Sequence, residues 1–210
     1  VHPSYQGQHL ATMLTDHILD LAVRELDSGK VSRLAFSTHI TAKQSIGLMT
    51  SRKFVLKQKY ALAMRNYEKS TPALENIKFE RWTPTLSEIQ KNNYLVSREG
   101  ILPLAFYFQE LTNAYFEHLL EREAFVIING HKGLQYFKGT ECYFLVFDES
   151  PEGILAFSDW CWEKHKDHSK GYPLTCFSLP NEALVGALKE VGFENWMDWE
   201  EDYLYFVYAP

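Results

Sequence analysis

Hydrophobic residues recur along the first third of the chain with the spacing of helices and of strands. Apolar positions from Leu10 to Leu21 follow an i, i+3, i+4, i+7 pattern, which predicts an amphipathic helix that ends near Leu26. The segments that follow are predicted to be a buried strand at 31–37, a second helix around 46–49 and a strand or hairpin at 54–66. This alternation of helices and strands is α/β (α+β) in character.

The remaining two thirds of the chain continue this alternation. Thr85 and Glu88 are spaced as a capping box, which predicts the start of a short helix. Residues 68–76 are polar and without periodicity, so they predict a linker. The other predicted elements are a helix at 105–121, a hairpin of 125–128 with 134–137, a strand at 142–148, a helix at 154–165, a strand at 173–179, a helix at 181–193 and a strand at 202–210.

The two halves of the chain share a local pattern. Residues 35–54 can be laid on residues 175–193 with a short gap, and each segment is a strand, a turn, a helix and a Phe that enters another strand. Any two strand–helix–strand units agree at this level. The apolar strands that follow both segments nevertheless favour a tandem duplication.

Composition and charge narrow the classes of partner and compartment. The net charge of −6 and the pI near 5.8 argue against nucleic acid as a partner. No apolar run approaches the length of a membrane span, so no membrane partner is expected. Three widely spaced cysteines predict a reducing, cytoplasmic location. Cys161, His165 and His168 are spaced like metal ligands, but no second cysteine pair supports them and no metal is expected.

A polar loop with Gly7 stands directly before the first predicted helix, in the stretch VHPSYQGQHLA. A helix N-terminus offers free N–H groups and a positive dipole end to an anion. The pattern V-x-P-x-Y-Q-G-Q-x-L-A, followed by a helix, a strand and a helix that ends at a Phe, resembles the second half of the GCN5-related N-acetyltransferase (GNAT) fold. The resemblance implies part of a mixed sheet, followed by a second, degenerate GNAT-like domain.

In that family, a Gln/Arg-x-x-Gly-x-Gly/Ala motif opens a helix whose backbone amides hold the pyrophosphate of acetyl-CoA. By position, Gln6 matches the first residue of the motif and Ala11 the last, while His9 stands where the family usually has Gly. The resemblance implies cofactor contacts from Val1, Gln6, Gly7, Gln8, His9, Leu10, Ala11, Thr12 and Ser45.

The resemblance also implies a reaction, the transfer of acetyl from acetyl-CoA to an amine of a small molecule. Thr38 and His39 follow a predicted strand where family members often line the acceptor cleft, and imidazole accepts protons near neutral pH. The alternative for His39 is an ordinary loop residue. Met49 stands where the family often has a Tyr that protonates the thiolate, and Met cannot donate a proton. A degenerate, non-catalytic binding or scaffold module is therefore the competing function.

The overall likeness is to the histidine N-acetyltransferase-like branch, whose members pair an acetyltransferase domain with a region built like a second copy. This implies that residues 1–67 are the C-terminal half of a catalytic domain, beginning at the end of its fourth strand. Residues 68–76 would be the linker, and residues 77–210 a GNAT-like domain without a phosphate loop. The implied acceptor is the α-amine of histidine or of another amino acid, and these residues alone are expected to be inactive.

Overall fold

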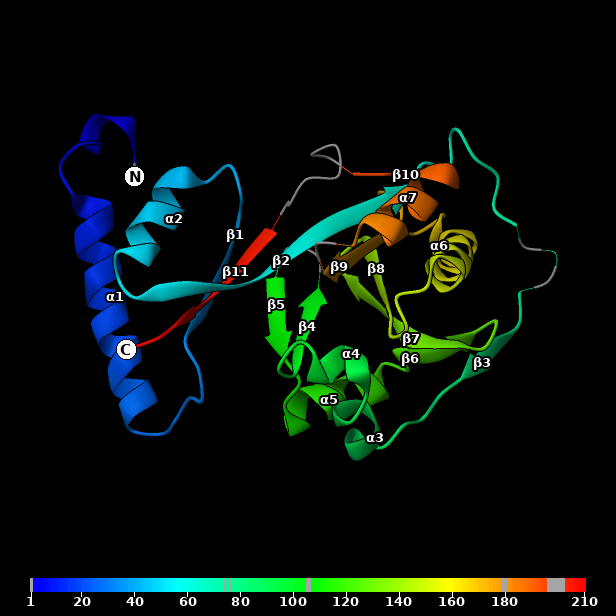
Figure 1. Cartoon of the computed structure of the whole chain (residues 1–210), viewed down its shortest axis with the longest axis horizontal. Coiled ribbons are helices and arrows are strands. Elements are labelled where there is room, and N and C mark those ends of the chain that lie inside the picture. Colours follow the sequence, from blue (N-terminus) through cyan, green and yellow to red (C-terminus); the bar gives the residue numbers. More distant parts are fainter. Residues whose placement is uncertain (1, 74, 76, 105–106, 179–180, 196–202) are drawn as a thin grey trace. The chain divides into compact units, whose positions relative to one another are not determined.

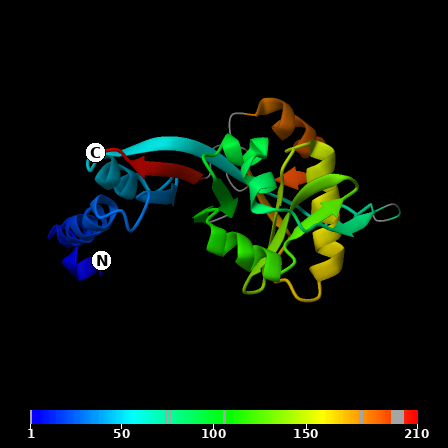
Figure 2. The ribbon, with the colours of Figure 1, turned by 90° about the horizontal axis from the view of Figure 1, so that it is seen from below.

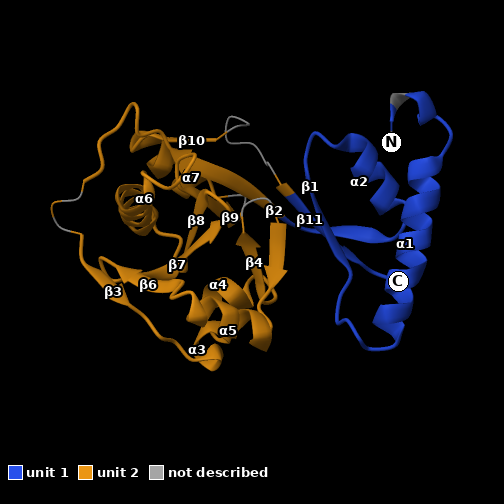
Figure 3. Ribbon diagram, turned by 180° about the vertical axis from the view of Figure 1, so that it is seen from behind, with its two compact units in different colours: residues 1–58, 204–210 blue, residues 59–203 orange. Residues whose placement is uncertain are grey.

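The computed structural model describes residues 2–73, 75, 77–104, 107–178, 181–195 and 203–210 (Figure 1). The chain forms two compact units, shown in Figure 3: residues 1–58 with 204–210, called unit 1, and residues 59–203, called unit 2. Both units combine helices with strands of a mixed sheet, which confirms the predicted α/β (α+β) class. The expected domains 1–67 and 77–210 stay a prediction, and the division between the compact units falls inside a strand.

Unit 1 packs two helices with three strands. Its elements are a 3₁₀ turn at Pro3–Tyr5, α1 (Leu10–Asp27), β1 (Ala35–His39), α2 (Lys43–Thr50), the first half of β2 (Phe54–Arg65) and β11 (Tyr203–Tyr208). The C-terminal strand β11 lies between β1 and β2 in the strand order. Its residue Phe206 is buried and stacks on Phe36 at 4.9 Å between ring centroids. The core of unit 1 therefore contains residues from both the N-terminal and the C-terminal part of the sequence.

Unit 2 is built on a larger mixed sheet. Its strands run in the order β2, β9 (Leu174–Ser178), β8 (Glu141–Val146), β7 (His131–Lys138), β6 (Phe125–Ile128) and β3 (Phe79–Arg81). β8 and β9 are parallel and pair at only two positions, Tyr143 with Leu174 and Phe144 with Thr175. The second half of β2 pairs with β9 and also with β10 (Phe193–Glu194). A separate hairpin consists of β4 (Ile101–Leu104) and β5 (Tyr107–Glu110).

The helices of unit 2 cover both faces of its sheet, as Figure 2 shows. α3 (Leu86–Gln90), α4 (Asn93–Val96) and α5 (Asn113–Glu121) pack in one core, and α6 (Pro151–His165) and α7 (Glu182–Glu190) in the other. Alternate residues of β8 enter opposite cores, Tyr143 and Leu145 on one side and Phe144 and Val146 on the other.

The predicted helix over 105–121 is wrong in its first half. Residues 107–110 form strand β5, paired with β4, and residues 105–106 lie outside the described part of the chain. The helix begins only at Asn113, because the Thr112 hydroxyl caps it by accepting the Tyr115 N–H at 3.2 Å. The first strand also differs from its prediction: it starts at Ala35, since the Val31 N–H still bonds to Glu25 at the end of α1.

The other predicted elements are confirmed within a few residues, and the segment at 54–66 is one strand rather than a hairpin. Asn129 and Gly130 close the β6–β7 hairpin, with φ of 53° and 87° as such a two-residue turn requires. Thr85 and Glu88 form both hydrogen bonds of the predicted capping box. The proposed repeat has matching element orders, since α1, β1, α2 and β2 correspond to α6, β9, α7 and β10, but the duplication itself stays a prediction.

Candidate functional site

The N-terminus of α1 lacks the features that normally satisfy the first turn of a helix. His9 is the N-cap residue and makes no capping hydrogen bond through its side chain, and the first turn contains no acidic residue. The first intrahelical bond runs from the Met13 N–H to the His9 carbonyl at 3.0 Å. The N–H groups before Met13 have no acceptor within the helix, so this end of α1 carries an unneutralised positive dipole.

This helix end opens onto a cleft of about 590 Å³ in unit 1, lined by Tyr5, Gln6, Gly7, His9, Leu10, Ala11 and Gln44. Gly7 has φ of 78°, a left-handed conformation that L side chains rarely adopt, and a Cβ at this position would meet nothing within 4 Å. Glycine is therefore favoured here by its backbone conformation and not by crowding. A cleft bounded by a polar loop and by N–H groups without helical acceptors suits an anion.

Five of the predicted cofactor-binding residues line this cleft, and the others lie beside it or elsewhere. Gln6, Gly7, His9, Leu10 and Ala11 belong to its lining, whereas Gln8 and Thr12 are in the same loop and first turn but not in the lining, and Val1 lies outside the described residues. Ser45 is exposed on α2, and its neighbour Gln44 lines the cleft instead. No sequence pattern points to Gln44 beyond its place in the first turn of α2.

Thr38 and His39 lie at the end of β1 and are not part of the lining of this cleft. The Nδ1 atom of His39 is 2.7 Å from the Thr41 hydroxyl and accepts the Thr41 backbone N–H at 3.3 Å. A neutral imidazole that accepts at Nδ1 carries its proton on Nε2. His39 can therefore accept a proton at Nδ1 only if its contact with the Thr41 amide is broken.

Met49 packs with the apolar residues of unit 1. It lines an apolar cleft of about 420 Å³ together with residues of α1 and β1 and with Phe54. Its side chain also contacts the core formed by Phe54, Leu204 and Phe206. Met49 therefore contributes to the packing of unit 1.

The N-terminus of α6, which follows β8 in unit 2, has the opposite character. The Ser150 hydroxyl accepts the Gly153 N–H at 3.2 Å, and Glu152 lies in the first turn. Partial burial raises the pKa of Asp148, but hydrogen bonds from His131 and Ser150 outweigh it and leave this pKa below the usual value. A capped N-terminus beside ionised carboxylates disfavours a second anion.

The predicted metal-like spacing in α6 corresponds to packing. The Cys161 thiol is fully buried, and both its hydrogen bond with Cys142 and its burial raise its pKa. The His165 ring packs edge-on against Phe137, with 4.3 Å between ring centroids. Among the described residues, no three His, Cys, Asp or Glu side chains are placed to hold a metal ion. In the same part of the chain, no helix is long and apolar enough to cross a membrane.

The fold is that of known acetyltransferases. A GCN5-related N-acetyltransferase from Sphaerobacter thermophilus matches 99% of this chain with a TM-score of 0.55 and 11% identity, and the match covers 70% of that protein. A tandem GNAT protein from the clavulanic acid biosynthesis pathway matches 100% of this chain with a TM-score of 0.51 and 10% identity, over 73% of its own length. No protein-family model and no curated protein matches the sequence. At these identities the likeness establishes a GNAT-like fold and no more.

Proposed function

We propose that this chain carries the coenzyme-binding part of an N-acetyltransferase that transfers acetyl from acetyl-CoA to an amine of a small molecule. The observation that carries the proposal is the uncapped, acid-free N-terminus of α1, which opens onto the cleft at Gln6–Ala11. The GNAT-like fold supports it, because the resemblance implies a pyrophosphate loop at this helix end. The α-amine of histidine or of another amino acid is the proposed acceptor.

The residues at this helix end fit the anionic part of acetyl-CoA. The N–H groups of Leu10, Ala11 and Thr12 precede the first intrahelical donor and can donate to a pyrophosphate. The His9 imidazole lines the same cleft. Acetyl-CoA, when bound, supplies the activated thioester. Thr38 and His39 remain the proposed acceptor-side residues, and a base role for His39 requires its ring to release the Thr41 amide.

The test is the variant Ala11→Glu, studied with acetyl-CoA in titration calorimetry. A carboxylate in the first turn stabilises a helix by about 0.3–1 kcal/mol, yet it repels a pyrophosphate at the same place. We therefore expect the variant to unfold at the same or a higher temperature and to bind acetyl-CoA at least about tenfold more weakly, a loss of about 1.4 kcal/mol.

The matched control is Ala22→Glu on the same helix, remote from the N-terminal cleft; Ala22 lines the apolar cleft of unit 1. It should leave acetyl-CoA affinity unchanged. If Ala11→Glu binds acetyl-CoA as tightly as the wild type, the N-terminus of α1 is not the pyrophosphate site and the proposal fails.

The packing of Met49 favours one second candidate, a binding module that retains the coenzyme without turnover. The two candidates differ in the release of the free coenzyme thiol, which a thiol-reactive dye measures while amines of amino acids are offered. Acetyl-CoA binding without thiol release supports the binding module.

The three cysteines are buried and free, which fits the proposed reducing, cytoplasmic location.

A further inference from the structure

Unit 2 contains a cleft that the proposed reaction does not use. It has a volume of about 670 Å³ and is lined by residues 92–94, 97 and 98 around α4, by Gly130 and Lys132 around the start of β7, and by residues 147–149 after β8. Three segments far apart in the sequence therefore supply one concave surface, which is the usual setting of a small-molecule site.

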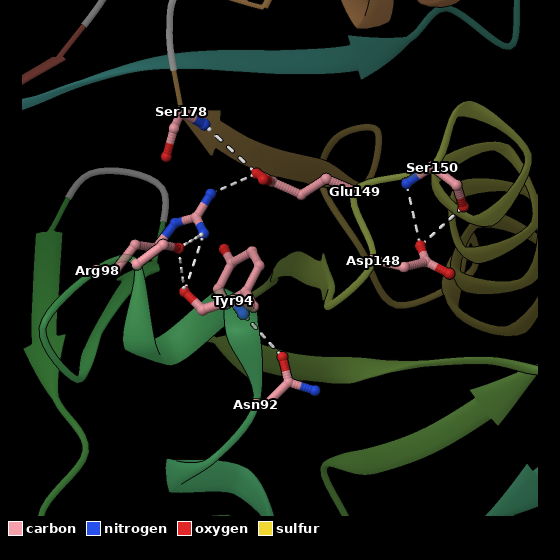
Figure 4. Close-up of polar contacts among 8 residues, drawn as sticks. Asn92, Tyr94, Arg98, Asp148, Glu149, Ser150 and Ser178 are labelled. Carbon is pink, nitrogen blue, oxygen red and sulfur yellow. Dashed lines mark hydrogen bonds and ion pairs between the residues drawn. The ribbon is translucent and has the colours of Figure 1, made fainter.

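Arg98 is one of the residues that line this cleft, and Figure 4 shows its polar contacts. Its side chain is only 3% exposed, and its guanidinium lies over the Tyr94 ring at 3.7 Å from the centroid. One terminal nitrogen donates to Glu149 at 2.5 Å, and the other donates to the Tyr94 carbonyl at 3.0 Å. The Nε of Arg98 is buried and has no acceptor within the described part of the chain.

Tyr94 also contains a buried polar atom without a hydrogen-bond partner among the described residues. The residue is 3% exposed, and this atom is its hydroxyl oxygen. Buried polar groups are normally paired, so these two unpaired groups, on residues that line one cleft, leave hydrogen-bonding capacity for an acceptor. Both groups can donate, and neither has found its acceptor within the protein.

The carboxylates that line the cleft are already engaged. The Asp148 carboxylate makes a hydrogen bond with the His131 ring at 2.7 Å and accepts one from the Ser150 N–H at 3.0 Å. One oxygen of Glu149 accepts hydrogen bonds from the Arg98 guanidinium and from the Ser178 N–H, the latter at 3.4 Å. Lys132 lies over the Trp82 ring at 4.6 Å, and its charge contributes to the lowered pKa of Glu88, a residue outside the lining of the cleft. The unused hydrogen-bonding capacity of the cleft is therefore mainly that of donors and a cation.

We infer that this cleft binds a small organic carboxylate, held by Arg98 and Lys132. Nε and the adjacent terminal nitrogen of a guanidinium form a fork that matches the two oxygens of a carboxylate. In the structure, Glu149 accepts a hydrogen bond from one nitrogen of this fork, and we expect the ligand carboxylate to replace it there. Tyr94 and Phe147 also line the cleft, with their rings 5.5 Å apart and almost fully buried.

Titration calorimetry on the whole chain with five probes tests the inference, and the fifth probe is inorganic phosphate. Benzoate and succinate carry the carboxylate, whereas benzamide and succinamide keep the shape and lack the charge. We expect at least one carboxylate to bind, with its amide at least about tenfold weaker, because charge-assisted hydrogen bonds are the stronger ones. Equal binding of acid and amide, no binding up to about 20 mM, or binding of inorganic phosphate alone would overturn the assignment.

Three variants locate the binding. Glu149→Gln frees the guanidinium from its internal partner and should raise the affinity for the bound carboxylate about tenfold, which a merely structural role for Glu149 would not do. Lys132→Ala should weaken binding several-fold, whereas Lys138→Ala, at the other end of β7 and over Tyr107, should not change it. Weaker binding by Glu149→Gln, or equal effects of the two lysine variants, contradicts the site.

Discussion

His9 adopts a backbone conformation that is unfavourable for a residue with a side chain. Its φ is 57° and its ψ is 17°, in the left-handed region that costs an L residue roughly 1–2 kcal/mol. Glycine populates this region freely and is also an acceptable N-cap residue. The resemblance expects Gly at this position, and the backbone conformation of His9 gives a physical reason for that preference.

We therefore expect His9→Gly to raise the free energy of unfolding by about 1 kcal/mol, measured by urea titration. The matched control is His17→Gly, in the interior of α1, which should lower the same quantity by about 1 kcal/mol because glycine weakens a helix interior. A loss of stability in both variants would show that the His9 side chain makes a stabilising contact that outweighs its backbone strain.

At the scale of single elements, the short helix α3 depends on an ionised side chain. The Thr85 backbone and hydroxyl both donate to Glu88, and these hydrogen bonds lower the pKa of Glu88 against a small opposing effect of burial. A carboxylate with a lowered pKa in the folded state stabilises it above the unfolded pKa. This contribution is lost as the pH falls through the folded value.

The variant Glu88→Gln isolates this effect, because glutamine keeps the capping box and does not titrate. We expect the unfolding free energy of the wild type to fall more steeply than that of the variant as the pH drops below about 4.5, the ordinary glutamate pKa. Parallel pH curves of the two proteins, measured by urea titration, would mean that the carboxylate does not contribute to folding.

Helix α6 is joined to the end of β2 by a buried ion pair and to the segment after β2 by hydrogen bonds. Asp159 on α6 is 1% exposed and is bound by Arg65, by the Tyr67 hydroxyl at 2.6 Å and by the Ala73 N–H at 3.0 Å. Burial and Asp159 raise the pKa of Tyr67, so its hydroxyl stays protonated and donates. The carboxylate thus has three donors, which compensate for its removal from water.

Asp159→Asn leaves the Arg65 guanidinium buried without its counter-charge, and we expect it to lower the unfolding free energy by about 3–5 kcal/mol. Tyr67→Phe removes one donor and keeps the ion pair, so its cost should be about 1 kcal/mol. Denaturant titration at neutral pH compares the two. Similar small losses would show that water replaces the lost partner of Arg65.

The limits of prediction from sequence also lie at the element scale. α1 and α7 were predictable because their apolar spacing and end signals are local. Residues 107–110 were not, because an aromatic-rich stretch fits helix and strand alike, and only pairing with β4 decides between them. The loop at Gln6–Ala11 was found from local signals, whereas Arg98 and Glu149 are 51 positions apart and only the fold brings them together.

At the scale of the whole molecule, several strands pair with strands that are distant in the sequence. Sequence patterns do not encode these pairings. β11 joins β1 and β2 in unit 1, whereas the second half of β2 lies between β9 and β10 in unit 2. In each unit, the sheet thus includes a strand from a distant part of the chain. Period and composition predict that a strand forms, but they do not specify its partner.

The consequence is that residues near the C-terminus stabilise the unit that contains the N-terminal loop. Phe206 is 2% exposed in the core of unit 1, and truncating a buried Phe costs about 3–5 kcal/mol. We expect Phe206→Ala to speed amide hydrogen exchange throughout residues 10–58, the α1 N-terminus included, and to leave residues 125–178 as protected as in the wild type. Phe144→Ala, in a core of unit 2, should do the reverse. Faster exchange along the whole chain in both variants would show that the protein opens as one cooperative unit and that β11 has no special role in unit 1.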